Sequence, residues 1–275
     1  MADEATLVFP QSLILAGAGK MGSALLESWL SLGLPGANIG VIDPHPSPAL
    51  SALAVQHGLT LAPHPLIAQV LLLAIKPQML DKAAPALQHY VDGRTLIISI
   101  LAGKTIATLR HHFPHAGAIV RAMPNLPASI GLGITGAVAG PELTQEQQAF
   151  ATTLLGAAGS VEWLDDEALI DAVTAISGSG PAYVFYFVEC LSQAGVALGL
   201  PQDISERLAR ATVEGAGGLL MHETGIRPAQ LRENVTSPGG TTAAALEVLM
   251  AQNGLAPLME QAAQAARKRA AELAG

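Results

Sequence analysis

The first residues with a recognisable chemical arrangement form a glycine-rich motif, G-x-G-x-x-G, in the run Gly17-Ala18-Gly19-Lys20-Met21-Gly22. The motif follows an apolar, strand-like run at 12–16 and opens a helical run at 21–32. In that context the three glycines permit a tight turn, a close approach of the backbone to a pyrophosphate, and close packing of helix on strand. The helix N-terminus adds N–H donors and a partial positive charge. We therefore predict that residues of this loop, namely Gly17, Gly19, Lys20, Met21 and Gly22, bind a dinucleotide, whereas the motif alone would indicate only a tight turn.

Asp43 lies 21 residues beyond Gly22, where the next strand-like run, 39–42, ends. A carboxylate at this place accepts hydrogen bonds from a ribose 2′-hydroxyl and repels a 2′-phosphate, which favours NADH. No arginine stands nearby to bind a 2′-phosphate, although His45 and Ser47 could contribute to one. The alternative is that Asp43 only starts a turn. The sequence therefore predicts NADPH or NADH without choosing between them.

A second anion-binding loop, besides the glycine-rich motif, is indicated near the C-terminus, in the run Ser237-Pro238-Gly239-Gly240-Thr241-Thr242. Two glycines let the backbone come close to a ligand. The N–H groups of Gly239, Gly240 and Thr241 open a helix whose dipole favours a carboxylate. The alternative is a simple helix start, capped by Ser237 or Thr241.

Polar and small residues also gather where strand-like runs end, the edge at which open α/β sheets bind ligands. The runs concerned are Ala74-Ile75-Lys76-Pro77-Gln78 and Arg121-Ala122-Met123-Pro124-Asn125-Leu126-Pro127. A third run, Ser177-Gly178-Ser179-Gly180-Pro181, reads as another glycine-rich helix start or as a flexible joint before a packed helix.

The elements that must position these residues fall into two groups. Up to residue 164, strand-like and helical runs alternate, which predicts an α/β Rossmann domain with a doubly wound parallel sheet. The strand-like runs are 12–16, 39–42, 70–75, 95–99, 118–121 and 131–137, and the helical runs are 21–32, 49–57, 77–89 and 105–112. Residues 165–275 contain only helical runs and are predicted to form an all-α dimerisation and substrate domain. These runs are 167–176, 181–198, 202–222, 228–234, 241–252 and 255–273.

The composition limits the partners. Half of the residues are hydrophobic and 13% are charged, so part of the apolar surface is expected between subunits. A net charge of −8 disfavours nucleic acid. The run 182–200 is apolar, but polar residues in its middle favour an interface helix over a membrane span. Asp3 and Glu4 argue against a signal peptide, so the cytoplasm is expected. Cys190 is the one cysteine, and nothing completes a metal site around the histidines, so we expect no metal.

These motifs, in this order and over nearly the whole chain, resemble the pyrroline-5-carboxylate reductase family. The most specific of them is the C-terminal one, which in full is Asn234-Val235-Thr236-Ser237-Pro238-Gly239-Gly240-Thr241-Thr242. The resemblance implies a swapped or intertwined helical dimer that can assemble further. It also implies reduction of a small cyclic imine that carries a carboxylate, pyrroline-5-carboxylate, to L-proline by hydride from NAD(P)H.

The resemblance further implies roles for individual residues. The loop from Ser237 to Thr242 would hold the carboxylate, and the Thr242 hydroxyl would reach the imine nitrogen as the catalytic group. The residues expected on the cofactor, besides the glycine-rich loop and Asp43, are Ala74, Lys76, Pro77, Met123, Asn125, Ser177 and Gly178. Among these, Asn125 would hold the nicotinamide carboxamide.

Two alternatives stay open. The first is another imine or β-hydroxyacid reductase of the same two-domain plan. The acid dehydrogenases of this plan would need a catalytic lysine in the first long helix after the Rossmann domain, and residues 177–200 contain no lysine. The second is a non-catalytic nucleotide-binding scaffold, which would be expected to have an eroded 237–242 loop, whereas this loop is intact.

Overall fold

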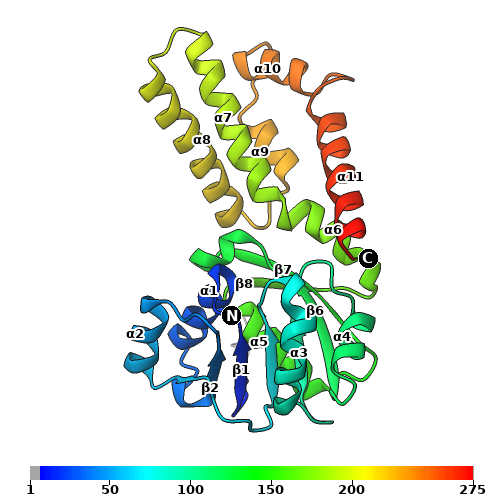
Figure 1. Ribbon diagram of the computed structural model, residues 1–275. Helices are drawn as coiled ribbons and strands as arrows, with labels where there is room; N and C mark the ends of the chain where they lie inside the picture. The colour runs from blue at the N-terminus through cyan, green and yellow to red at the C-terminus, as the bar shows by residue number, and fades with distance from the viewer. Residues whose placement is uncertain (1–6, 275) are drawn as a thin grey trace. The chain divides into compact units, whose positions relative to one another are not determined.

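The computed structural model describes residues 7–274, so the acidic residues Asp3 and Glu4 lie outside the described part (Figure 1). Within that part, the N-terminal half builds one eight-stranded sheet. Its strands are β1 Leu13–Ala16, β2 Ile39–Ile42, β3 Thr60–Leu61, β4 Val70–Leu73, β5 Leu96–Ser99, β6 Ala118–Met123, β7 Gly133–Ala139 and β8 Gly159–Trp163. All six predicted strands are present, and β3 and β8 were not predicted.

The strand order is β3-β2-β1-β4-β5-β6-β7-β8, with β1 to β6 parallel, as predicted. The sheet departs from parallel pairing at one end, because β7 runs antiparallel to β6 and β8 pairs with β7 in parallel. The connection 124–132 is shorter than the dozen or so residues that a parallel crossover requires. The chain therefore turns back after β6.

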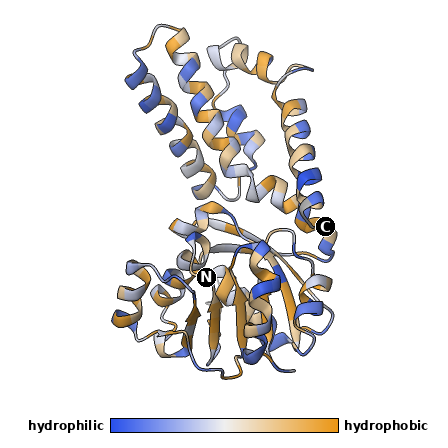
Figure 2. Cartoon of the chain, in the orientation of Figure 1, coloured by the Kyte–Doolittle hydropathy of each residue, from blue (hydrophilic) through white to orange (hydrophobic). Residues whose placement is uncertain are grey.

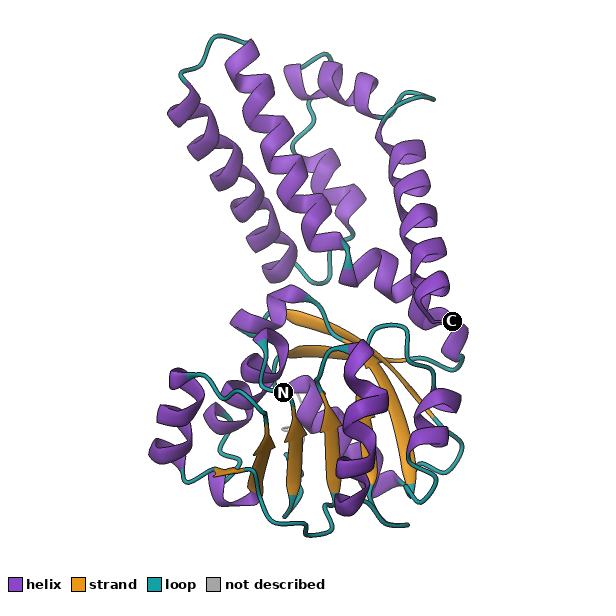
Figure 3. Cartoon of the chain, in the orientation of Figure 1, coloured by secondary structure: helices purple, strands orange, loops and turns teal. Residues whose placement is uncertain are grey.

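Helices cover both faces of the sheet, as expected for a doubly wound fold (Figure 3). They are α1 Lys20–Ser31, α2 Pro48–His57, α3 Leu80–Leu87, α4 Ile106–His112 and α5 Gln145–Gly156. Helix α5 was not predicted, although it begins with a complete capping box between Thr144 and Gln147. Alternate strand residues pack against α1, α2 and α5 on one face and against α3 and α4 on the other.

The central strands β1, β4 and β5 are apolar except for Ser99 at the end of β5, and Figure 2 shows them mostly in the hydrophobic colour. Every residue of β1, β4 and β5 is buried, because each side chain meets helices on one face or the other. This burial holds the carboxyl ends of the strands, and the loops after them, in fixed positions.

The C-terminal part is helical, as predicted. Its elements are α6 Ile170–Val173, α7 Gly180–Ala197, α8 Gln202–His222, α9 Pro228–Asn234, α10 Thr241–Leu249 and α11 Leu255–Ala274. The chain divides into two compact units, 1–179 with 266–275, and 180–265. The first unit thus includes α6, and the domain boundary placed between 164 and 165 stays a prediction.

One helical stretch, Glu167–Ala197, is long and apolar enough to cross a membrane by length and composition alone. Only 11% of its most apolar window is buried, and Phe185, Tyr186 and Phe187 are exposed on α7. The stretch overlaps the 182–200 run that the sequence indicated as an interface helix. Exposed apolar surfaces of this kind often mark sites of interaction with a partner.

Candidate functional site

The three glycines of the G-x-G-x-x-G motif meet different surroundings between β1 and α1. Gly17 has φ +94°, and a Cβ there would lie 2.8 Å from the Ala74 carbonyl oxygen. A Cβ at Gly22 would collide with the Gly17 carbonyl oxygen. By contrast, a Cβ at Gly19 would meet no atom within 4 Å. Gly17 and Gly22 are thus required by the packing of the loop itself, whereas the space beside Gly19 is open to a ligand.

Helix α1 begins at this loop with free donors. Gly19 is its N-cap and supplies no side-chain cap, and the Ser23 N–H makes the first helical bond, to the Gly19 carbonyl oxygen at 2.8 Å. The N–H groups of Lys20, Met21 and Gly22 have no acceptor among the described residues. An uncapped helix start with an open approach is suited to a pyrophosphate, so these residues fit the dinucleotide that the motif implies.

Asp43 is bound to the glycine-rich loop. One of its carboxylate oxygens, Oδ2, accepts a hydrogen bond from the Ala18 N–H at 2.9 Å, and Oδ1 accepts one from the His45 N–H at 2.9 Å. The sequence offered Asp43 as a ribose ligand or as a turn residue. The structure shows a third role, because Asp43 also holds the glycine-rich loop by a hydrogen bond. The spacing in the sequence alone could not indicate this contact.

Residues at the end of β4 lie beside the first glycine. The Ala74 N–H donates to the Ala16 carbonyl oxygen at 2.8 Å and so continues the pairing of β4 with β1. Lys76 is exposed and is the N-cap of a short 3₁₀ turn, Pro77–Met79. Ala74 is therefore fixed near the loop, while the Lys76 ammonium reaches solvent.

At the end of β6, Met123 is half-buried and Asn125 is buried. The Asn125 Oδ1 accepts a hydrogen bond from the Ile134 N–H at 3.0 Å, which ties the connection to β7. Its Nδ2 makes no hydrogen bond within the described residues. The free Asn125 Nδ2 could donate a hydrogen bond to a nicotinamide carboxamide, and its Oδ1 retains a second lone pair.

Ser177 and Gly178 lie in a π-helical turn, Thr174–Gly178, and not at a free helix start. The Ser179 N–H donates to the Thr174 carbonyl oxygen at 2.8 Å, and the chain continues into α7. The glycine-rich run therefore leads from the π-helical turn into α7, and cofactor binding by Ser177 and Gly178 stays a prediction. Among the side chains that the structure describes, the Ser177 Oγ is the one buried polar atom without a partner.

The Ser237–Thr242 loop opens α10 in the second unit. Gly239 has φ +70°, Gly240 is the N-cap, and no side chain caps the helix, so Ser237 and Thr241 are not the caps. The Gly240 N–H donates to the Ser237 carbonyl oxygen at 3.0 Å and is unavailable to a ligand, which corrects its predicted role as a donor.

The free backbone donors at this helix start come after Gly240 in the chain. In the described part, the N–H groups of Thr241 and Thr242 and the hydroxyls of Ser237 and Thr242 have no partner. A backbone cradle with a hydroxyl in the first helical turn can hold a carboxylate and one further polar atom of a small ligand.

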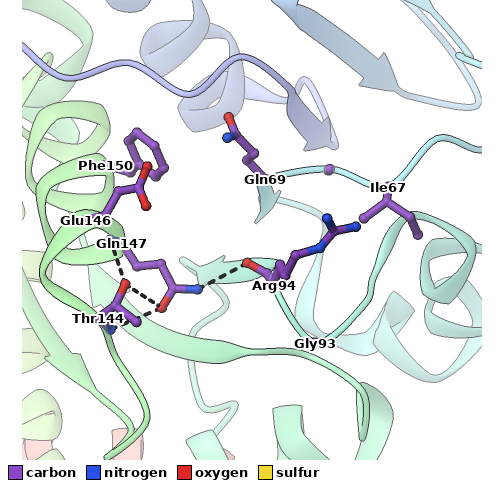
Figure 4. Close-up of a pocket in the computed structure, with 9 residues that line it drawn as sticks. Ile67, Gln69, Gly93, Arg94, Thr144, Glu146, Gln147 and Phe150 are labelled. Carbon is purple, nitrogen blue, oxygen red and sulfur yellow. Dashed lines mark hydrogen bonds between the residues drawn. The ribbon is translucent and has the colours of Figure 1, made fainter.

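The hollow shown in Figure 4 lies in another part of the first unit. It has a volume of about 480 Å³ and lies where β4 and β5 begin, lined among others by Gln69, Arg94 and Gln147. Hydrogen bonds from the Arg94 side chain and from its backbone N–H lower the pKa of Asp92 beside it. Ligands of open α/β sheets bind at the opposite ends of the strands, so this hollow is separate from the glycine-rich loop.

Comparison with known proteins decides the family. A family model described as pyrroline-5-carboxylate reductase dimerisation matches residues 167–273, and one described as NADP oxidoreductase, coenzyme F420-dependent, matches residues 13–103. The pyrroline-5-carboxylate reductase of Pseudomonas aeruginosa is 39% identical over 261 residues, which cover 94% of this chain and 95% of that protein. The chain belongs to the pyrroline-5-carboxylate reductase family.

Further relatives agree. The Synechocystis pyrroline-5-carboxylate reductase is 44% identical over 207 residues, 75% of this chain and 76% of that protein. A solved pyrroline-5-carboxylate reductase from Coxiella burnetii has a TM-score of 0.88 and 32% identity, and it covers 96% of this chain and 99% of its own. The Plasmodium falciparum enzyme, solved with NADP bound, has a TM-score of 0.77 and 26% identity over 96% and 98% of the two chains. The predicted family and the two-part fold are thereby confirmed.

Proposed function

We propose that the chain reduces 1-pyrroline-5-carboxylate to L-proline with NAD(P)H, the last step of proline biosynthesis. Family membership supports the reaction, since relatives that share most of the chain are pyrroline-5-carboxylate reductases. The observation that carries the proposal is the uncapped start of α10, where free N–H groups and the Thr242 hydroxyl suit a small ligand with a carboxylate and a ring nitrogen.

The dinucleotide residues would act by binding and orientation. Bound NAD(P)H supplies the hydride that adds to the imine carbon. The N–H groups of Lys20, Met21 and Gly22 would hold its pyrophosphate, and Asp43 its adenosine ribose. The cofactor would also be contacted by Ala74, Lys76, Pro77, Met123, Asn125, Ser177 and Gly178, of which Asn125, Ser177 and Gly178 would lie at the nicotinamide. Fixed placement of this kind is the main contribution of a protein to cofactor chemistry.

On the substrate side, Gly239, Thr241 and Thr242 would hold the carboxylate through backbone N–H groups. The Thr242 hydroxyl would hydrogen-bond the ring nitrogen, which takes up a proton from solvent while the imine carbon accepts the hydride. Gly240 would contribute by its N-cap position, because its own N–H is engaged with Ser237. No basic side chain is required for the anion, in keeping with the net charge of −8.

We also propose that the working form is a homodimer or a multiple of one, located in the cytoplasm and binding neither nucleic acid nor membrane. The dimerisation model that matches residues 167–273 and the exposed aromatic side chains of α7 support the assembly. The acidic net charge argues against nucleic acid.

The test of the function is NAD(P)H oxidation, followed at 340 nm, with pyrroline-5-carboxylate as the substrate and L-proline as the product to be identified. The six-membered imine is a second substrate in the same assay, and a β-hydroxyacid is tested in the oxidative direction with NAD(P)+, where the formation of NAD(P)H is followed. Turnover of the hydroxyacid but not of the pyrroline would favour the other reductase class. Binding of NAD(P)H without turnover of any imine would favour a scaffold.

A further inference from the structure

A buried arginine at the end of β6 is held by two carboxylates from the segment that follows the sheet. The Arg121 side chain is only 6% exposed. Its Nη1 donates to the Glu167 Oε1 at 2.9 Å, and its Nη2 lies 3.5 Å from the Asp171 Oδ1. A planar guanidinium directs two nitrogens along two fixed lines, which a lysine ammonium cannot do. All three residues belong to the first unit.

The same Glu167 oxygen joins a third element. It also accepts a hydrogen bond from the Ile106 N–H at 2.8 Å, at the start of α4. Asp166, the preceding residue, caps the 3₁₀ turn Glu167–Leu169 through the Ala168 N–H at 2.9 Å. The start of the helical stretch that leads into α6 is therefore fixed against β6 and α4 by directional bonds.

Helix α6 connects this fixed segment to the π-helical turn. A Cβ at Gly136 would lie 2.8 Å from the Val173 Cγ1, so α6 packs directly on the β7 backbone. A Cβ at Gly178 would lie 3.0 Å from the Met123 Cε, so the turn packs beside the end of β6. Single π-helical turns occur frequently at functional sites.

The turn bears the buried Ser177 hydroxyl that has no partner in the described structure. A buried polar group without a hydrogen bond is unfavourable, so such an atom requires a reason. A ligand that completes its hydrogen bond would supply one. The neighbouring strand ends, after β4 and β6, belong to the edge at which dinucleotides bind in this kind of sheet.

We propose that Arg121 is a positioning residue for the cofactor: through Glu167 and Asp171 it fixes α6, and so holds the Ser177 hydroxyl where the nicotinamide end binds. The inference rests on the proposed function in taking NAD(P)H as the ligand. A buried ion pair adds little stability over well-packed apolar side chains. What it adds here is direction, since it sets how α6 leaves the sheet.

The test compares two ligands by calorimetric titration in the absence of substrate: NADH, and ADP-ribose, which retains the pyrophosphate but lacks the nicotinamide. Arg121→Lys and Glu167→Ala are expected to raise the Kd of NADH roughly fivefold, the effect of about one lost hydrogen bond. The Kd of ADP-ribose should stay within about twofold in both. Glu167→Gln, which retains the acceptor oxygen, should restore wild-type binding. Glu142→Ala, which removes the exposed partner of Arg110 at 3.1 Å, is the matched control and should change neither Kd.

A double-mutant cycle with Ser177→Ala shows whether the cluster acts through this hydroxyl. The Glu167→Ala/Ser177→Ala protein should bind NADH no more weakly than Ser177→Ala alone. Once the Ser177 hydroxyl is gone, the loss of Glu167 can no longer move it. The inference would be overturned if the losses of NADH affinity in the two single variants added up in the double variant. It would also be overturned if the single variants lost affinity equally for NADH and ADP-ribose, or lost no affinity for NADH. If Glu167→Ala does not fold, Asp171→Ala takes its place in the same comparison with the same outcomes. A wild-type protein that binds NADH but does not reduce pyrroline-5-carboxylate would overturn only the proposed function.

Discussion

The Asp43 carboxylate accepts a hydrogen bond from the Ala18 N–H at 2.9 Å, and this bond connects the end of β2 to the middle of the glycine-rich loop. The residue proposed to meet the adenosine ribose therefore also shapes the loop proposed to meet the phosphates. Its other oxygen accepts from the His45 N–H, so both carboxylate oxygens already have one backbone donor. Each oxygen retains lone-pair capacity for a ribose hydroxyl.

This double role changes how cofactor choice should be tested at Asp43. Replacement by serine would shorten the side chain and release the loop as well as remove the charge. Asp43→Asn removes the charge that would repel a 2′-phosphate and keeps the side-chain length and one acceptor oxygen, so it can retain one of the two backbone hydrogen bonds. We expect the ratio of kcat/KM for NADPH to that for NADH to rise by about fivefold, the size of a partly exposed charge interaction. Steady-state kinetics with both cofactors measures it, and an unchanged ratio would leave Asp43 as a loop anchor only.

The open space beside Gly19 makes this residue a clean probe of the pyrophosphate site. Gly19→Val should weaken NAD(P)H binding by roughly tenfold or more, since extra atoms in a packed contact cost about 1–3 kcal/mol. The unfolding midpoint should hardly move, because no protein atom lies within 4 Å of the added Cβ. Gly93→Val is the control, because Gly93 has the same open surroundings at the end of the sheet where β5 begins. Full cofactor affinity in Gly19→Val would remove the loop from the site.

Much of the sheet could be predicted because its strands are continuous apolar runs between helical ones. The runs at β1, β4 and β5 are buried on both faces, and their sequences show it directly. Strand β8 alternates half-buried and exposed residues, a weak pattern that a loop can share. The reversal at β7 could have been expected from the short 124–132 connection. Helix α5 could have been expected from its Thr144 and Gln147 capping pair.

The candidate site was predictable where a motif and a backbone conformation coincide, and less so where tertiary contacts decide. The glycines of both loops follow from their spacing. By contrast, the engagement of the Gly240 N–H by Ser237 depends on a local turn. The cluster of Arg121 with Glu167 and Asp171 joins residues more than 40 positions apart in the chain, which periodicity cannot reveal.

The assembly can be tested on α7, whose aromatic side chains are the most conspicuous exposed apolar group in the second unit. Phe185 is 56% exposed in the single chain. We expect Phe185→Asp to weaken self-association by about thirtyfold or more, the effect typical of an aromatic anchor at the centre of an interface. Sedimentation velocity at micromolar concentration should then show a monomer in place of a dimer or its multiple. Val55→Asp, at an 88% exposed site on α2, is the control and should sediment as the wild type. A wild-type protein that is itself monomeric would contradict the proposal.

The function depends most on the start of α10, and the structure shows which substitution tests it. A bulky residue at Gly240 is unsuitable, because even a Cβ there would lie 2.5 Å from the Ser237 Oγ and disturb the loop itself. Thr242→Val retains the shape of the side chain and removes only the hydroxyl, which has no partner in the described structure. If that hydroxyl bonds the ring nitrogen, its loss should cost about 1–3 kcal/mol of transition-state stabilisation. That is roughly a tenfold to hundredfold fall in kcat/KM for pyrroline-5-carboxylate, with the Kd of NAD(P)H unchanged. Thr241→Val is the matched control, because only the backbone N–H of Thr241 is assigned a role, so it should retain near-normal turnover. Equal turnover of the two variants would show that the Thr242 hydroxyl takes no part in the reaction, and the ring nitrogen would then have to find its partner elsewhere.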